Sequence, residues 1–235
     1  MNHPNLESNL EFQGPSCSNF EFTSDFFPWF KTNVVILCFG LYYTKSCFSY
    51  DGKLTHIGDS NYEHYRGGLT KYNGSLVTVG GSWNNQKTEI LKIDQNKNFS
   101  WSIVESDFEF TLGVHITDHS LVTVESFDIN EEYVLLIGGM TGEMSPLKNV
   151  FKFNGTWLAF GKLNKPRYYH SSIYWNGAVY VIGGRHDWDD QNTKMEIWEI
   201  KDSPDQFETK ENWPELFSWG KPHLFILPDS FFPDH

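Results

Sequence analysis

The densest group of chemistry-bearing side chains lies in one short loop, Arg185-His186-Asp187-Trp188-Asp189-Asp190. Carboxylates supply the oxygen ligands that Ca²⁺ prefers, so this loop is the first candidate for a metal site. A calcium-binding loop also needs an ordered glycine and a terminal glutamate, and both are missing here. We therefore interpret the segment as a solvated acidic loop, and we predict no metal site and no cofactor.

The remaining reactive residues form no catalytic pattern. The sequence has no Ser-His-Asp order, no phosphate-binding loop and no zinc-ligand spacing. Its three cysteines are Cys17, Cys38 and Cys47, too few for a disulfide framework. Cys38 and Cys47 fall on two segments that we expect to pair as strands. They predict either one cross-strand disulfide in an oxidising compartment or two buried thiols.

Composition narrows the class of protein. The 235 residues carry a net charge of −12, which argues against nucleic acid and fits neutral or basic partners. No apolar run reaches the ~20 residues that span a bilayer. The polar N-terminus is not a signal peptide as it stands, so we expect an intracellular soluble protein, with secretion as the alternative. Asn-x-Ser/Thr triplets at Asn73, Asn98 and Asn154 leave the compartment open.

A repeat organises most of the chain. An apolar run ends in a glycine pair three times, at Gly80-Gly81, Gly138-Gly139 and Gly183-Gly184. A degenerate copy ends at Gly40, with Phe39 where the first glycine belongs. A polar loop, a β-rich run and a further strand follow each copy. Three of those further strands hold a tryptophan: Trp101, Trp157 and Trp213.

Each full copy also has a strand before the glycine run. Asn73-Gly74 and Asn176-Gly177 join the two strands in two of the copies, and Asn-Gly is the strongest short signal for a β-hairpin. The unit is therefore four antiparallel strands, a, b, c and d, with the glycine pair at the end of b. One such sheet cannot cover its own faces, so neighbouring sheets must stack.

This pattern resembles the kelch repeat, in which each copy forms one blade of a β-propeller. The resemblance covers roughly residues 33–229 and implies an all-β kelch-type propeller of about four four-stranded blades. We place the blades near residues 33–60, 64–106, 112–162 and 166–215, with residues 1–32 as an N-terminal extension or strap outside the repeat. We find no segment before Val34 that matches the first strand (a) of the repeat. A C-terminal strand near 222–229 would therefore pair with the first blade and close the ring. Kelch propellers usually have about five to seven blades, so an incomplete propeller or a homodimer stays open.

Antiparallel topology places the b–c and d–a loops at one end of the sheets, where binding loops usually lie. We predict that this end binds a partner protein or peptide, which the kelch resemblance also implies, and that the chain is not an enzyme. Tyrosine, tryptophan and arginine dominate interface hot spots, and these loops are rich in them. The candidate residues are His64, Tyr65, Arg66, Trp83, Arg167, Tyr168, Tyr169, Arg185, His186 and Trp188.

Two alternatives follow from the resemblance. Some kelch-like propellers are enzymes with a metal or small-molecule site at the channel mouth, of the galactose-oxidase or isomerase type. The Tyr, Tyr–Cys and two-His set that the copper oxidases need does not occur here in a matching arrangement. The other alternative is an extracellular adhesion-type kelch protein.

Overall fold

The chain folds into antiparallel sheets. The computed structural model describes residues 20–22, 34–40, 43–50, 52–81, 87–93, 98–105, 115–126, 131–186, 195–199 and 208–209. These residues form four four-stranded sheets and one two-stranded sheet, and they contain no helix. Among them, no segment could cross a membrane as a long apolar helix. The all-β architecture predicted from the repeat is confirmed.

The first sheet differs from the prediction at its N-terminal edge. Its order is β1 (Phe20–Phe22), β2 (Val34–Gly40), β3 (Tyr43–Tyr50) and β4 (Leu54–Asp59). We expected no strand before Val34, yet β1 pairs with β2 in antiparallel register, with Phe22 opposite Val34. β1 takes the edge of β2 that we had assigned to a closing strand near 222–229, and that segment lies outside the described residues.

The second and third sheets follow the predicted strand order. The second consists of β5 (Gly68–Tyr72), β6 (Ser75–Val79), β7 (Thr88–Ile93) and β8 (Phe99–Val104). The third consists of β10 (Ser120–Ser126), β11 (Glu131–Ile137), β13 (Asn149–Phe153) and β14 (Trp157–Lys162). A small sheet of β9 (Ile116–Thr117) and β12 (Met140–Thr141) lies beside the third sheet.

The fourth sheet is β15 (Tyr168–Trp175), β16 (Ala178–Arg185), β17 (Glu196–Glu199) and β18 (Glu208–Thr209). Asn176 and Gly177 both have positive φ in the β15–β16 turn, as Asn73 and Gly74 do between β5 and β6. Hairpin turns of this kind require positive φ at both central residues, which explains the Asn-Gly pairs. Trp213 lies outside the described residues.

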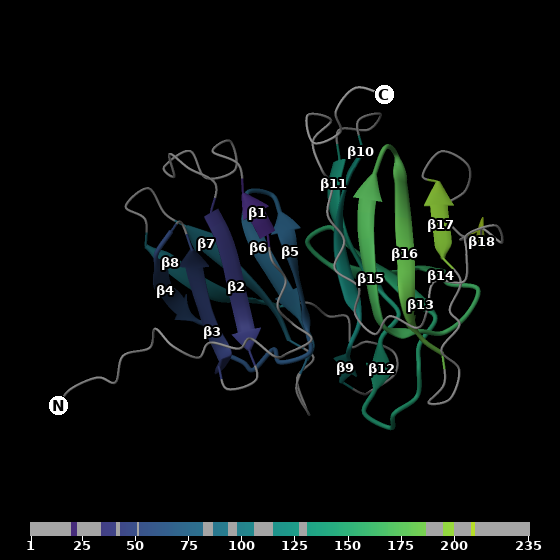
Figure 1. Ribbon diagram of the computed structural model, residues 1–235, viewed down its shortest axis with the longest axis horizontal. Helices are drawn as coiled ribbons and strands as arrows, with labels where there is room; N and C mark the ends of the chain where they lie inside the picture. The colour runs from purple at the N-terminus through teal and green to yellow at the C-terminus, as the bar shows by residue number, and fades with distance from the viewer. Residues whose placement is uncertain are drawn as a thin grey trace.

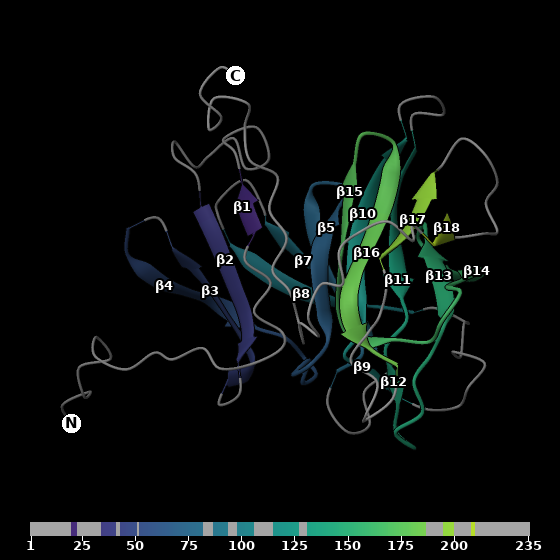
Figure 2. The same ribbon diagram turned by 45° about the vertical axis from the view of Figure 1, so that its right-hand side comes forward.

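The first strands of successive sheets lie side by side. β5, β10 and β15 are neighbours in the middle of the molecule in both Figure 1 and Figure 2. Thr70 of β5 and Thr123 of β10 are joined through their hydroxyl groups at 2.9 Å. The Ser172 hydroxyl of β15 donates to the Ser120 hydroxyl of β10 at 2.9 Å. Polar side chains therefore link the inner strands of three sheets.

The faces between these sheets are apolar. Trp157 of β14 is almost fully buried, and its indole N–H donates to the Thr88 hydroxyl of the second sheet at 2.8 Å. Trp101 packs on the cluster that joins the first and second sheets. These two tryptophans thus lie between sheets, where their large side chains contribute apolar area to the packing.

The glycine pairs stand where one sheet meets the loop of the next. Gly80 and Gly138 have left-handed φ values of 63° and 56°. A Cβ on Gly80 would lie 2.5 Å from the Ile116 carbonyl oxygen, and one on Gly138 would lie 2.6 Å from the Arg167 carbonyl oxygen. Both positions need glycine for its conformation and for the close approach of two backbones.

The sheets have two different ends. The loop end is built by residues 60–67, 115–119, 138–148 and 163–169, which connect sheets or join second to third strands. The turn end carries the hairpin turns after Tyr72, Phe153 and Trp175 and the start of β8. In Figure 1 the β15–β16 turn lies at the top and β9 and β12 lie at the bottom, so the ends are opposite.

Candidate functional site

Three residues at the loop end form a connected cluster, one from each of three successive sheets. Arg66 and Asp118 precede β5 and β10, Tyr169 lies at the start of β15, and all three have left-handed φ, at 66°, 54° and 58°. The Asp118 amide donates to the Arg66 carbonyl at 2.8 Å, and the Tyr169 amide donates to the Asp118 carbonyl at 3.1 Å. They therefore occupy equivalent positions of the repeat. We call these three residues the inner cluster.

The side chains of the inner cluster also meet. The Arg66 guanidinium donates from Nε to Asp118 Oδ1 at 2.9 Å and from Nη2 to Asp118 Oδ2. The same Nη2 donates to the Tyr169 hydroxyl at 2.8 Å, and the guanidinium lies 5.5 Å from the centre of the Tyr169 ring. This two-point contact fixes the arginine in one orientation. Asp118 was not among the candidate residues predicted from the sequence, although its place in the repeat matches those of Arg66 and Tyr169.

Charge is balanced within the inner cluster. Burial opposes the charge on Arg66, but the hydrogen bond and negative charge of Asp118 outweigh it and raise the pKa of the guanidinium. Burial, assisted by the charge of Asp118, raises the pKa of the Tyr169 hydroxyl. Tyr169 is therefore a neutral phenol at neutral pH, and Arg66 and Asp118 form an ion pair. Such a group suits recognition by shape and hydrogen bonding better than proton transfer.

Two residues that we predicted to contact a partner are instead buried, and they form hydrogen bonds that fasten their loops. His64 is fully buried, with Nδ1 2.8 Å from the Gly80 carbonyl oxygen and Nε2 2.9 Å from Glu89 Oε2. Arg167 is 1% exposed and donates to the Gly183 carbonyl at 3.0 Å and to Glu196 Oε1 at 2.5 Å. We call the His64–Glu89 and Arg167–Glu196 pairs the loop staples.

The carboxylates of the loop staples also accept backbone amides. Glu89 accepts from the amides of Asn61 and Tyr62, each at 2.9 Å. Glu196 accepts from the Asn164 amide at 2.7 Å. Burial would raise the pKa of Glu89, but the hydrogen bonds from His64 and Asn61 outweigh it and lower that pKa. Each staple therefore fastens a loop between sheets to the third strand of the following sheet.

One pair in the interior resembles a nucleophile beside a base. His170 Nε2 lies 2.9 Å from the Ser120 hydroxyl, and both side chains are buried. His119 is equivalent to His170 in the repeat, and its Nε2 accepts the Gly68 amide at 3.1 Å. Burial lowers the pKa of His119 to about 3, and burial also lowers the pKa of His170 well below 6.5. Both imidazoles are neutral and weakly basic, and both tie one sheet to the sheet before it.

The predicted partner-binding residues divide into three groups. Tyr65, Arg66, Tyr169, Arg185 and His186 are partly exposed. His64, Arg167 and Tyr168 are buried, because the first two are stapled and Tyr168 pairs in β15 opposite Arg185. These three side chains are therefore not part of the exposed surface on which we predicted them to lie. Trp83 and Trp188 lie outside the described residues.

Exposed side chains add two residues to the loop end. Met144, in the loop between β12 and β13, is 51% exposed, and Tyr62 is 37% exposed. Met144 was missed because residues 142–148 contain no tyrosine, tryptophan or arginine, the residue types used as the signal. Tyr62 belongs to the tyrosine-rich loop before β5. Among the described residues, no three His, Cys, Asp or Glu side chains group so that they could hold a metal ion.

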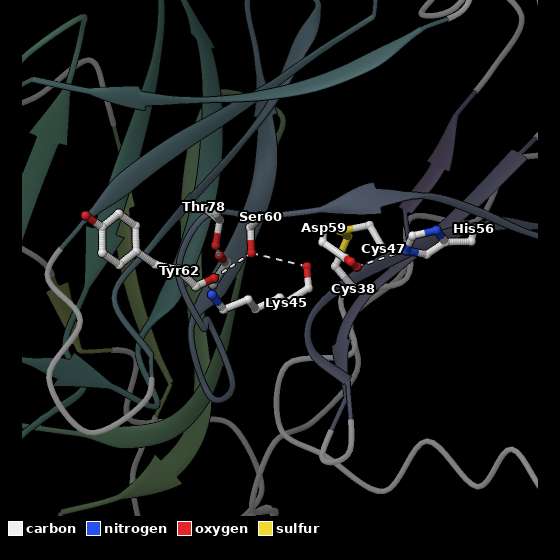
Figure 3. The surroundings of a disulfide bond; sticks show 9 residues. Cys38, Lys45, Cys47, His56, Asp59, Ser60, Tyr62 and Thr78 are labelled. Atoms are coloured by element: carbon white, nitrogen blue, oxygen red, sulfur yellow. Dashed lines mark hydrogen bonds and ion pairs between the residues drawn. A yellow bond between two sulfur atoms is a disulfide. The ribbon is translucent and has the colours of Figure 1, made fainter.

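A disulfide joins Cys38 of β2 to Cys47 of β3, which are direct cross-strand partners. Both residues are buried. Figure 3 shows the bond beside His56 and Asp59 of β4, which contact each other at 2.9 Å. The bond lies within the first sheet and does not reach the inner cluster.

The comparisons support the fold. No family model and no curated protein matches the sequence. Among solved structures, the chain is similar to the structure of YjhT, with a TM-score of 0.53 and 17% sequence identity. The match covers 71% of this chain and 52% of that chain, so this chain spans about half the length of YjhT. At this identity the likeness concerns the fold alone, and with the stacked sheets it supports a β-propeller-like fold.

Proposed function

We propose that the chain is a kelch-type propeller unit of about four blades that binds a partner protein or peptide through its loop end, without catalysis. The kelch assignment is supported by the glycine pairs and by the loop staples, which recur at matching positions of the second and fourth sheets.

The observation that carries the binding proposal is the combination of exposed and fixed side chains at the loop end. Tyr62 and Met144 are exposed there, and Tyr65, Arg66 and Tyr169 are partly exposed. Tyrosine, methionine and arginine are enriched at the centres of protein interfaces. The inner cluster and the loop staples hold the loops that carry Tyr62, Tyr65 and Tyr169 in place, so binding through them costs little ordering of the surface.

The partner is expected to be neutral or basic at its contact surface. The chain carries a net charge of −12, so it repels acidic partners over long range and attracts basic ones. The one arginine of the inner cluster is already paired with Asp118. The contact with the partner is therefore made mainly by aromatic rings, the methionine and hydroxyl groups.

The test compares the two ends of the molecule. A Y62A/Y65A/M144A variant removes three exposed or partly exposed loop-end side chains that belong to no staple. W175A removes a side chain that is 54% exposed at the turn end, and it serves as the matched control. In quantitative affinity capture, we expect the triple variant to bind the partner at least roughly ten-fold more weakly, since hot-spot truncations cost more than 1 kcal/mol each.

The control is expected to bind like the unmodified chain, and circular dichroism checks that both variants keep their sheets. If the triple variant retains the partner, the loop end is not the binding surface. If W175A loses the partner instead, the turn end binds it.

A further inference from the structure

Three asparagines gather at the turn end, and each begins an Asn-x-Ser/Thr triplet. Asn73 lies in the β5–β6 turn and Asn154 in the β13–β14 turn, while Asn98 directly precedes β8. The hydroxyl residues at the third positions are Ser75, Ser100 and Thr156. A hairpin turn needs Asn-Gly for its backbone, but it does not need a hydroxyl two residues after the asparagine.

All three asparagines are exposed. Asn73 has a left-handed φ of 46°, and the Asn154 amide donates to the Thr156 carbonyl at 3.2 Å, so both residues lie within tight turns. Exposed turns of this kind accommodate a bulky substituent without loss of core packing. At the opposite end, the described loops contain no such triplet.

A second observation points to the compartment in which asparagines are glycosylated. The Cys38–Cys47 disulfide requires an oxidising environment to form and persist, such as the lumen of the endoplasmic reticulum or the cell exterior. Cytosolic thiols are kept reduced. The disulfide and the triplets lie in different sheets and rest on different residue types, so they are independent observations.

We propose that Asn73, Asn98 and Asn154 are N-glycosylation sites, and that the turn end is the glycan-bearing end of the molecule. The donor is an oligosaccharide linked to a lipid pyrophosphate, supplied by the transferase of the secretory pathway. A bond forms between the asparagine Nδ2 and the anomeric carbon of the sugar. The bond from that carbon to the pyrophosphate oxygen breaks, the amide nitrogen loses one proton, and the lipid pyrophosphate departs.

The folded surroundings of Asn154 are compatible with a glycan. Its Nδ2 donates to Glu131 Oε1 at 2.7 Å, and its Oδ1 accepts from the Tyr72 hydroxyl at 3.1 Å. A glycosylated Nδ2 retains one hydrogen, which can keep the bond to Glu131. Tyr72 is the neighbour of Asn73, so glycans on Asn73 and Asn154 would flank the boundary between the second and third sheets.

This inference does not rest on the proposed function. It has one consequence for that function, because glycans at the turn end would shield that end and leave the loop end accessible.

The first test uses the chain captured by antibody from the cells that naturally make it. Peptide N-glycosidase treatment in heavy-oxygen water converts each glycosylated asparagine to a labelled aspartate, which peptide mass spectrometry locates. We expect conversion at Asn73, Asn98 and Asn154. Conversion at one site or at none would overturn the proposal.

The second test assigns the sites by substitution, in the full chain directed into the secretory pathway of a eukaryotic host. N73Q, N98Q and N154Q should each remove one mobility step on a gel. S75A, S100A and T156A should remove the same steps while leaving the asparagines in place. Because glycans are added to the nascent chain, this readout does not depend on the folded stability of a variant.

The β15–β16 turn provides a matched control. Asn176 is exposed, has a φ of 48° and lies in an Asn-Gly turn at the same end, but Ala178 stands where the hydroxyl is required. N176Q should leave the mobility unchanged, and A178S should add one step. If A178S gains a step while S75A, S100A and T156A lose none, the turn end is accessible to the transferase, but the three natural triplets are not used and the proposal fails.

Discussion

The loops before the second, third and fourth sheets each place a buried side chain toward the third strand of the sheet that follows, but the interactions differ. Before the second and fourth sheets, a buried basic residue, His64 or Arg167, pairs with a glutamate on the third strand of the same sheet. In the third sheet the matching positions hold Ile116 and Phe151, each 1% exposed and both in one apolar cluster. Packing of two apolar side chains therefore takes the place of a hydrogen-bonded polar pair in the same fold.

This difference between polar and apolar pairs shows what the staples contribute to stability and to the position of the loops. Desolvation of two charges offsets much of their attraction, so a buried ion pair adds little net stability over an apolar pair of similar volume. It nevertheless makes the structure intolerant of losing either partner. The polar solution also accepts amides from the adjoining loop, which Phe151 cannot do. The staples thus fix the loops that carry Tyr62 and Tyr169 more than they hold the sheets together.

The largest effect is expected from removing one partner of the fourth-sheet staple. E196A leaves the Arg167 charge buried without a counter-charge and frees the Asn164 amide. Breaking a buried pair in this way costs about 3–5 kcal/mol of unfolding free energy. Urea unfolding at neutral pH should show a lower midpoint.

The matched control is E125A, which removes an exposed pair with Lys71, 2.9 Å apart. Exposed pairs contribute about 0–1 kcal/mol. Equal losses in E125A and E196A would contradict the view that burial makes the staple sensitive.

The first sheet differs from the other three at its glycine position and in its disulfide, and this difference leads to the next prediction. It lacks the first glycine of the pair, and the buried Phe39 takes a left-handed φ of 62° at that position. The adjacent Cys38 is bonded to Cys47, nine positions along the chain. The chain-entropy estimate for a loop of this length is roughly 2–3 kcal/mol. Adding a reductant should lower the urea midpoint accordingly, and an unchanged midpoint would mean that β2 and β3 hold together without the bond.

The position directly after the inner-cluster residue distinguishes the second sheet from the third and fourth. Gly67 stands there in the second sheet, whereas the third and fourth sheets carry the buried His119 and His170. Their folded pKa values are lowered, to about 3 for His119, so the unfolded chain binds more protons below its own pKa of about 6.5. Stability contributed by the neutral imidazoles is present above that pH and is lost as the pH falls.

We expect His119 to cost about 1.4 kcal/mol per pH unit below pH 6.5, or about 2 kcal/mol at pH 5. His170, whose pKa burial also lowers, should add a loss in the same direction. Urea unfolding at several pH values between 7 and 5 measures this slope. H119Q and H170Q should each reduce it, and the double variant should reduce it further. A slope unchanged by both substitutions would assign the acid sensitivity to other groups.

The sequence predicted most of the strands because their signals are local. The glycine pairs and the Asn-Gly turns at Asn73 and Asn176 mark hairpins within a few residues, and the structure has those turns. β1 was not predicted, because the three residues Phe20–Phe22 form a strand only through their partner β2. Short strands that depend on a distant partner carry little signal of their own.

The candidate site was harder to predict, since its contacts join distant positions. Arg66 reaches Asp118, 52 positions away, and Tyr169, 103 positions away. The burial of His64 and Arg167 depends on Glu89 and Glu196, which face them from the third strands. One signal was available: Thr88-Glu89 and Met195-Glu196 both place a glutamate at the start of a third strand, where an unpaired buried charge would not be tolerated.

The smallest effect is expected from copying the third-sheet solution into the fourth sheet. R167I/E196F places at these positions the same residue types as Ile116 and Phe151. It removes both charges together, so no uncompensated charge stays buried, and it adds apolar volume between the loop and β17. The cost that remains is the lost bond to the Gly183 carbonyl and the released amides of Asn164 and Lys165. Both residues are exposed, so water can replace the carboxylate for their amides.

We therefore expect the double variant to lose only about 1–2 kcal/mol, less than E196A alone, because replacing a buried pair by packed apolar groups is often close to neutral. The same urea titration measures both variants. If R167I/E196F is as unstable as E196A, the apolar pair of the third sheet depends on neighbours that the fourth sheet lacks, and the two solutions are not interchangeable. If it is as stable as the natural chain, the staple is retained for the position of its loop, and the loop-end binding assay should then detect the difference that unfolding does not.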